Sequence, residues 1–174
     1  MPRNIEIKAR IDRVQACLPL ALALADGAPE SIEQDDTFFR VAKGRLKLRR
    51  FADGSAELIH YERADAVEAK ASDYVRVAVP DPDALSEALT RGLGQIGRVR
   101  KQRLLLLVGQ TRVHLDRVES LGDFIELEVV LDPAQSDAEG AAIAEQLMLR
   151  LGLVDAPRLA GAYLDLIEAV SRGN

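Results

Sequence analysis

The chain has 174 residues, 48% of them hydrophobic, which is enough for one compact domain with a core and too little for two comfortable ones. The formal net charge is −5 and aromatic residues make up only 4%, so neither nucleic acid nor an anionic membrane is favoured as a partner. Any site for an anion must therefore be local.

Two features of the first 25 residues bear on cellular location. The single cysteine, Cys17, excludes an intramolecular disulfide and favours a reducing compartment. The apolar run 16–25 has the length of a signal segment, but it contains Pro19, is too short to cross a bilayer and follows a well-patterned strand that cleavage would discard. We therefore expect a cytoplasmic protein with no membrane segment.

The first half of the chain is predicted to form strands with charged faces. Residues 4–12 alternate between apolar and polar side chains, with Glu6 and Lys8 on the polar face. The stretch 13–25 predicts a helix that Pro19 breaks or bends unless that residue lies in the first turn. Further strands are expected at residues 31–41, 45–51, 56–63 and 73–79, with a loop over 64–72.

The second half continues this pattern and then turns helical. Asp81 is a candidate N-cap for a helix over 83–92. A long strand follows at 97–108, and two more lie within 112–131, joined by a turn. Apolar spacing predicts a helix after Ser136 and a last one after Pro157. About eight strands with helices at three places predict an α+β domain with one large antiparallel sheet.

Cations and carboxylates are concentrated on different strands of this sheet. Glu126 and Glu128 share one strand face, about 6.5–7 Å apart. Arg112, His114 and Asp116 share the corresponding face of the preceding strand. The cations gather at Arg45, Lys47, Arg49, Lys101 and Arg103. A solvated sheet face with weak ion pairs explains any single strand, but it does not explain this segregation.

A sheet of about eight strands can close into a barrel, which would turn these charges inward. Buried charges in such number need a polyanion and a metal to be tolerated. Rows of Arg and Lys suit phosphate oxygens, whereas clustered carboxylates without a neighbouring cysteine suit Mg²⁺ or Mn²⁺. The pattern alone therefore favours a linear polyphosphate or a nucleoside triphosphate bound with a divalent metal.

Eight motifs run through nearly the whole chain in one order: IEIKARI (5–11), QDDTFF (34–39), GRLKLR (44–49), ELIHYER (57–63), SDYVRV (72–77), VRKQR (99–103), RVHLD (112–116) and LGDFIELE (121–128). In content and order they resemble the CYTH domain, the triphosphate tunnel metalloenzymes that include class IV adenylyl cyclases, thiamine triphosphatases and inorganic triphosphatases. The resemblance implies that residues 1–174 form a single CYTH-like domain, an eight-stranded antiparallel β-barrel or tunnel with flanking helices.

The resemblance also implies roles for individual residues. The metal-binding acids would be Glu6, Asp116, Glu126 and Glu128, with Mg²⁺ or Mn²⁺ as the cofactor. The catalytic residues would be Glu6, Lys8, Glu126 and Glu128. The triphosphate would be held by Lys8, Arg45, Lys47, Arg49, Arg63, Lys101, Arg103 and Arg112. The family mechanism uses one metal to hold the phosphates and a second to ready the nucleophile.

Two departures from the family pattern are evident. Asn4 stands where the ExExK signature has its first acid, which would weaken or relocate the second metal. Some family hydrolases use a lysine near the C-terminus, but no lysine follows Lys101 in this chain. That role is either empty or falls to Arg158 or Tyr163.

Three functions remain open from the sequence. We favour a metal-dependent triphosphatase, because hydrolysis needs only the cradle, the metal and water. A class IV adenylyl cyclase is the alternative, since the chain length and the segment SLGDFIELE resemble that branch, although the sequence reveals no adenine pocket. A non-catalytic polyphosphate-binding module would result if Asn4 has cost the protein its activating metal.

Some residues keep two interpretations at this stage. His114 is either a phosphate or acid/base contact or a structural hydrogen-bonding residue. Tyr61 and Tyr74 are either substrate contacts or polar core residues. The expected partner is a small-molecule triphosphate, and a homodimer is compatible with the way antiparallel tunnels often pair.

Overall fold

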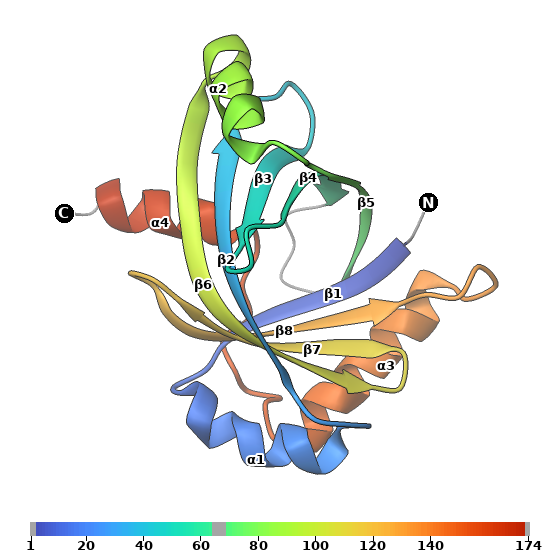
Figure 1. Cartoon of the computed structure of the whole chain (residues 1–174). Coiled ribbons are helices and arrows are strands. Elements are labelled where there is room, and N and C mark those ends of the chain that lie inside the picture. Colours follow the sequence, from blue (N-terminus) through green and yellow to red (C-terminus); the bar gives the residue numbers. More distant parts are fainter. Residues whose placement is uncertain (1–2, 64–68, 173–174) are drawn as a thin grey trace.

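The protein, a computed structural model, is described for residues 3–63 and 69–172, except for the side chains of Arg63, Lys70, Ser72 and residues 170–172. Eight antiparallel strands close into a barrel in the order β1-β5-β4-β3-β2-β6-β7-β8 (Figure 1). The predicted eight-stranded tunnel with flanking helices is thus confirmed. The strands are β1 (Arg3–Arg10), β2 (Glu30–Phe39), β3 (Arg45–Phe51), β4 (Ala56–Arg63), β5 (Lys70–Ala78), β6 (Gln95–Val108), β7 (Thr111–Val118) and β8 (Gly122–Val130).

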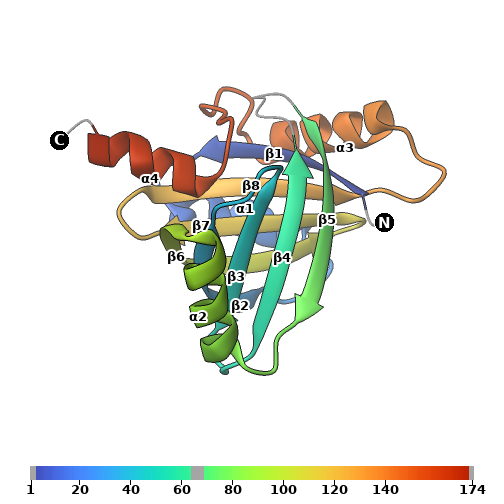
Figure 2. The ribbon, with the colours of Figure 1, turned by 90° about the horizontal axis from the view of Figure 1, so that it is seen from above.

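Four helices accompany the barrel: α1 (Val14–Leu24), α2 (Pro82–Leu93), α3 (Asp137–Arg150) and α4 (Tyr163–Arg172). Helices α1 and α3 lie against the same half of the barrel, where α3 contacts β1 and β8 and α1 contacts β7 (Figures 1 and 2). Helix α2 lies at the other half, against β2 and β3. Among residues 3–63 and 69–172, no helix has the length and apolar composition needed to cross a membrane.

The alternation of side chains along each strand decides what lies inside the barrel and what lies outside. On β1, Ile5 and Ile7 face outward and are fully buried under α3 together with Leu127 of β8. A second outer core forms where α2 covers Phe39 and Leu48. Because the helices cover the apolar outer face, the charged alternate positions of the same strands are left to line the interior.

The start of α4 fills one end of the barrel interior. Tyr163 and Leu164 pack against Phe38, Val99 and Phe124, which are inward-facing residues of β2, β6 and β8. The rings of Tyr163 and Phe124 have centroids 4.9 Å apart. A Cβ at position 97 of β6 would collide with the Leu164 side chain, so glycine is required there. The interior is consequently apolar and closed at this end.

Most of the elements predicted from the sequence are found in the structure, but the predicted start of β5 is wrong. Strands at 45–51 and 56–63 and the Asp81 cap, whose side chain accepts a hydrogen bond from the Ala84 amide at 3.0 Å, are confirmed. The loop predicted over 64–72 is wrong for Lys70–Ser72, which begin β5; residues 64–68 lie outside the described part of the chain. Pro19 lies within α1, which continues through it.

Candidate functional site

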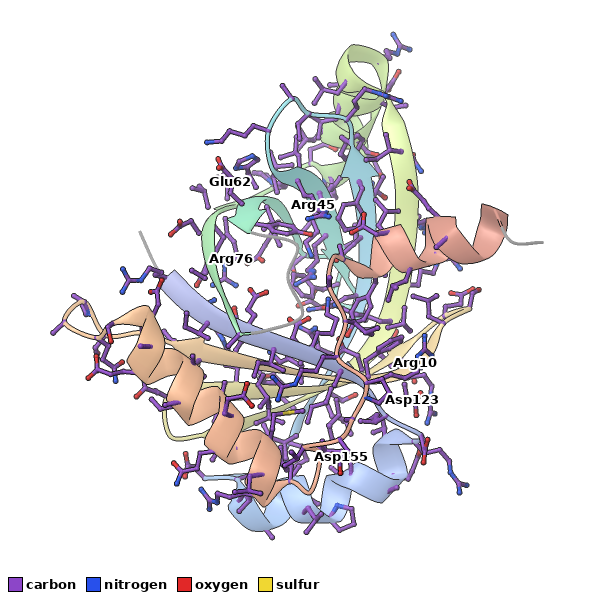
Figure 3. All side chains as sticks on the ribbon, turned by 180° about the vertical axis from the view of Figure 1, so that it is seen from behind. Arg10, Arg45, Glu62, Arg76, Asp123 and Asp155 are labelled. Atoms are coloured by element: carbon purple, nitrogen blue, oxygen red, sulfur yellow. The ribbon has the colours of Figure 1, made fainter. Side chains whose placement is uncertain are left out.

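The barrel encloses a cavity of about 280 Å³, open to solvent and lined by inward-facing side chains from all eight strands and the start of α4. Many side chains of the strands point into the space that the barrel encloses (Figure 3). Seven of the lining residues are Arg or Lys and five are Asp or Glu: Lys8, Lys47, Arg49, Arg76, Lys101, Arg103 and Arg112 against Glu6, Asp36, Glu57, Glu126 and Glu128. The cavity is thus positive although the chain carries a net charge of −5.

One group of cations is held by Asp36 of β2. The register of β2 and β3 places Asp36 opposite Arg49. Its carboxylate accepts two hydrogen bonds from Arg49, both at 2.7 Å, and one from the Lys47 ammonium at 2.8 Å. Asp36 is only 2% exposed. Burial by itself would raise the pKa of Asp36, but Arg49 and Lys47 outweigh burial and hold that pKa well below its usual value.

A second group is organised around Asp116 of β7. Arg103 donates to both carboxylate oxygens at 2.6 and 2.7 Å, and the Tyr163 hydroxyl donates at 2.9 Å. The Lys101 ammonium lies 3.6 Å away. Asp116 is completely buried, and although burial opposes ionisation, Arg103 and Lys101 keep its pKa below the usual range. Both oxygens of Asp116 are therefore occupied in holding cations.

The cations of these two groups repel one another in a desolvated space. Burial, reinforced by Arg49, lowers the pKa of Lys47 to about 8. Burial and the adjacent Arg103 likewise hold the pKa of Lys101 well below its usual value. An anion that entered the cavity would raise the pKa of each lysine and so favour its charged form. The electrostatics of the site therefore favour an anionic ligand with several charges.

The acids Glu6, Glu126 and Glu128 line the adjoining wall of the cavity. The pairing of β1 with β8 places Glu6 opposite Glu128 and Lys8 opposite Glu126. Lys8 lies 3.2 Å from Glu126, and Arg112 donates to Glu128 at 2.8 Å. Burial raises the pKa of Glu128, and the charges of Glu126 and Glu6 add to that effect, while Arg112 opposes it. If these carboxylates are all ionised, they repel one another, and a bound cation would offset that repulsion.

The donor chemistry of this wall fits a divalent metal, although its side chains are not gathered around one point. Within residues 3–63 and 69–172, no group of three or more acids, histidines or cysteines stands ready as a ligand set. Asn4, completely buried, donates its amide nitrogen to Glu128, and its Oδ1 has no hydrogen-bond partner among the described residues. An amide oxygen without a partner, on a side chain that contacts Glu128, matches the preference of Mg²⁺ and Mn²⁺ for oxygen ligands.

His114 lies between the two glutamates of β8. Its Nδ1 is 3.6 Å from Glu126, and its Nε2 is 3.9 Å from Glu128. Burial, together with Arg103, lowers the pKa of His114 to about 4, so the imidazole is neutral at pH 7. The N–H of a neutral ring in this position can donate a hydrogen bond to one glutamate without adding a charge to the site.

Arg45, another predicted phosphate ligand, is not among the residues that line the cavity. Arg45 of β3 donates to Asp165 of α4 at 2.7 Å and lies beside the start of that helix (Figure 3). The Arg63 side chain lies outside the described part of the chain, so its predicted role stays a prediction. Arg158 forms a bidentate pair with Glu145, both bonds at 2.6 Å. Tyr163, the other candidate for the C-terminal role, lines the cavity.

Sequence reasoning missed Asp36 as a site residue and the contacts that Tyr163 makes with the cradle. The alternation of residues 31–41 puts Asp36 on the same strand face as Gln34 and Phe38, a signal that could have pointed to Asp36 but that names no partner for it. Tyr163 stacks under the Lys8 ammonium, 4.0 Å from the ring centroid, in addition to its bond with Asp116. Neither contact is local in sequence, because one depends on strand register and the other on the return of the chain to the barrel.

A closed antiparallel barrel with an internal, cation-rich cavity beside a row of carboxylates defines a tunnel protein for anionic ligands. The chain belongs to the CYTH domain family, whose model matches residues 2–163. It is 28% identical over 179 residues to the adenylate cyclase CyaB of Aeromonas hydrophila, covering 95% of this chain and 88% of that protein.

Solved structures have the same fold. The PH1012 protein of Pyrococcus horikoshii OT3 superposes with a TM-score of 0.84 at 26% identity, covering 94% of this chain and 98% of that one. A Hippeastrum protein, described as a putative adenylyl cyclase with a dominant triphosphatase activity, gives a TM-score of 0.65 at 15% identity over 93% and 91% of the two chains. The latter likeness concerns the fold alone.

Proposed function

We propose that the protein is a divalent-metal-dependent enzyme that hydrolyses a triphosphate-bearing substrate inside its tunnel. The observation that carries this proposal is the excess of cations over acids among the residues that line one cavity, in a chain of negative net charge. A single small anion would leave most of these cations unsatisfied, whereas a linear chain of three phosphates supplies several charges along one line.

The chain's own residues bind and orient the phosphates. Arg49 and Arg103 are held in fixed directions by bidentate pairs with Asp36 and Asp116, so little side-chain entropy is lost when phosphate oxygens arrive. The remaining cations of the cradle are Lys8, Lys47, Lys101 and Arg112, with Arg45 and Arg63 as further predicted ligands. The apolar end formed with α4 excludes water from one side of the site.

Glu6, Glu126 and Glu128 are the residues that would hold Mg²⁺ or Mn²⁺, with the Asn4 amide oxygen as a neutral donor. Such an ion supplies charge neutralisation on the phosphates and activation of the attacking oxygen. We assign Asp116 a different task from the one first expected, because both of its oxygens already bind Arg103 and one also accepts from Tyr163. Asp116 holds the cradle rather than the metal.

Cyclisation is the second candidate reaction. The A. hydrophila relative is named an adenylate cyclase and matches 95% of this chain, which supports the class IV adenylyl cyclase alternative. In that reaction a ribose hydroxyl, in place of water, attacks the phosphate nearest the sugar and releases pyrophosphate. Hydrolysis stays our first choice because it needs no geometry beyond the cradle and the metal.

Analysis of the products decides between these reactions. The purified protein is incubated with ATP, tripolyphosphate or thiamine triphosphate in Mg²⁺ or Mn²⁺, and cyclic AMP, pyrophosphate and orthophosphate are resolved. Orthophosphate without a cyclic product supports the triphosphatase, whereas cyclic AMP with pyrophosphate establishes the cyclase. Binding of tripolyphosphate without any turnover would leave only the polyphosphate-binding module.

A further inference from the structure

Helix α1 has an exposed apolar side that the tunnel does not use. None of its 11 residues is charged, whereas α2, α3 and α4 each contain both acids and bases. Val14, Cys17 and Ala21 pack into the outer core that α1 shares with β7. The opposite side of α1 faces solvent, although a helix that is apolar on every side is normally covered on every side. That side is therefore a candidate contact surface.

Four exposed residues form a stripe along this side of the helix: Ala16, Pro19, Leu20 and Ala23. They are spaced at i, i+3, i+4 and i+7, which places them on one face. Leu20, near the middle, is 49% exposed. The spacing is the same in both chain directions, so a second copy of the stripe that runs the opposite way meets the first in register. Ala16 then lies opposite the partner's Ala23, and Leu20 lies opposite the partner's Pro19.

Charges of opposite sign flank the stripe at equal distances. Arg13 lies three residues before Ala16, and Asp26 lies three residues after Ala23. Both are exposed, and the Gly109 amide donates to Asp26 Oδ2 at 2.7 Å, which holds that carboxylate in place. When two copies pair in opposite directions, Arg13 of each lies beside the partner's Asp26. The two ends thus form two ion pairs related by symmetry.

We propose that this stripe is the contact surface of a homodimer, in which two α1 helices pack antiparallel about a two-fold axis level with Pro19 and Leu20. A two-fold axis makes every contact twice, so a self-complementary stripe suits a second copy of the chain. The small side chains of Ala16 and Ala23 let the helices approach closely. An anionic membrane is disfavoured, because the stripe holds no basic residue and the chain has a net charge of −5.

The position and length of α1 set the strength of this contact. Two helices of 11 residues bury less than the roughly 1,200–2,000 Å² of a standard interface, so the dimer should be weak and dependent on concentration. Helix α1 lies outside the barrel, against β6 and β7, and contributes no residue to the cavity lining (Figure 1). The proposal is therefore independent of the function of that cavity.

Sedimentation equilibrium tests the contact surface, using the wild type, Leu20→Glu and the control Val77→Glu. Val77 is a similarly exposed apolar residue, at 56%, on the outer face of β5. We expect the wild type to form dimers with a dissociation constant of roughly 10–100 µM. Leu20→Glu should raise that constant at least about tenfold, because two glutamates would meet near the two-fold axis. Val77→Glu should leave it unchanged.

A wild type that is still monomeric at about 1 mM, or a dimer that is equally stable in Leu20→Glu, would overturn the proposal. Flotation with phosphatidylcholine vesicles examines the other occupant of an apolar surface. We expect no binding. Vesicle binding that Leu20→Glu abolishes would assign the stripe to a lipid surface and overturn the dimer.

Disulfide cross-linking tests the antiparallel register. In an equimolar mixture of Ala16→Cys and Ala23→Cys, the introduced thiols lie opposite one another across the interface, as a disulfide requires. Disulfides should therefore form mainly between the two variants, which a tag on one of them distinguishes by mass. The native Cys17 is buried and does not compete. Cross-links that form as readily in either variant alone would contradict the antiparallel pairing.

Discussion

Asp36→Asn tests whether the buried acids pre-organise the cation cradle. The substitution keeps the size of the side chain and removes the negative charge that Arg49 and Lys47 share at 2.7 to 2.8 Å. Asp36 is 2% exposed, so the two cations lose their counter-ion in a nearly dry environment. Breaking a buried pair in this way costs roughly 3–5 kcal/mol of unfolding free energy. For a chain of this size, that corresponds to a fall of about 10 °C in Tm.

The matched control is Asp35→Asn, the same change one residue away on the outer face. Asp35 pairs with Arg98, whose Nε donates at 2.6 Å, but the Asp35 side chain is 27% exposed and that of Arg98 is 48% exposed. Its loss should cost less than about 1 kcal/mol. Thermal unfolding is measured for both variants with and without tripolyphosphate, which should restore more stability to Asp36→Asn because it replaces the missing charge. Equal destabilisation of the two variants, or equal rescue, would refute the reasoning.

Three other predictions concern the same cavity. Glu126→Gln should abolish metal-dependent turnover while tripolyphosphate still binds in EDTA; retained turnover would remove Glu126 from the metal site. Arg49→Ala should weaken tripolyphosphate binding in titrations by roughly 2–5 kcal/mol, whereas Arg50→Ala, on the outer face of β3, should have little effect. The pKa of Lys47 lies at about 8 in the free protein, so affinity should fall as pH rises through 8, when the ammonium loses its proton. Lys47→Arg should show a smaller fall, because its guanidinium stays charged whereas Lys101, whose pKa is also lowered, still loses its proton.

The sequence was sufficient to predict which residues share a face of each strand, but not which residues of the neighbouring strands lie beside them. The alternation in residues 45–51 predicted correctly that Arg45, Lys47 and Arg49 share one side of a strand. That pattern carries no information about the strand beside it, because register depends on the connecting turn and on closure of the whole barrel. The contact of Asp36 with Arg49 therefore could not be predicted from the alternation of residues along either strand.

The error at residues 70–72 has a physical cause of the same kind. The segment KAS contains small and polar residues with weak strand preference, so the local sequence predicted a loop. In the structure these residues pair with β1, with Lys70 opposite Glu6 and Ser72 opposite Asn4. This pairing joins β5 to β1 and closes the barrel. The requirement for closure thus overrides local preference at the one seam that makes the sheet a tunnel.

The two buried aspartates explain how a tunnel for polyanions can fold without its ligand. Cations lining a desolvated cavity would repel one another and destabilise the empty protein. Asp36 and Asp116 each share one negative charge between an Arg and a Lys, and both carboxylates use bidentate geometry on the arginine. This arrangement leaves a smaller positive excess, enough to attract phosphates and small enough to be tolerated when they are absent. The same acids hold the guanidinium groups in place, so stability of the empty tunnel and readiness for the ligand have one structural origin.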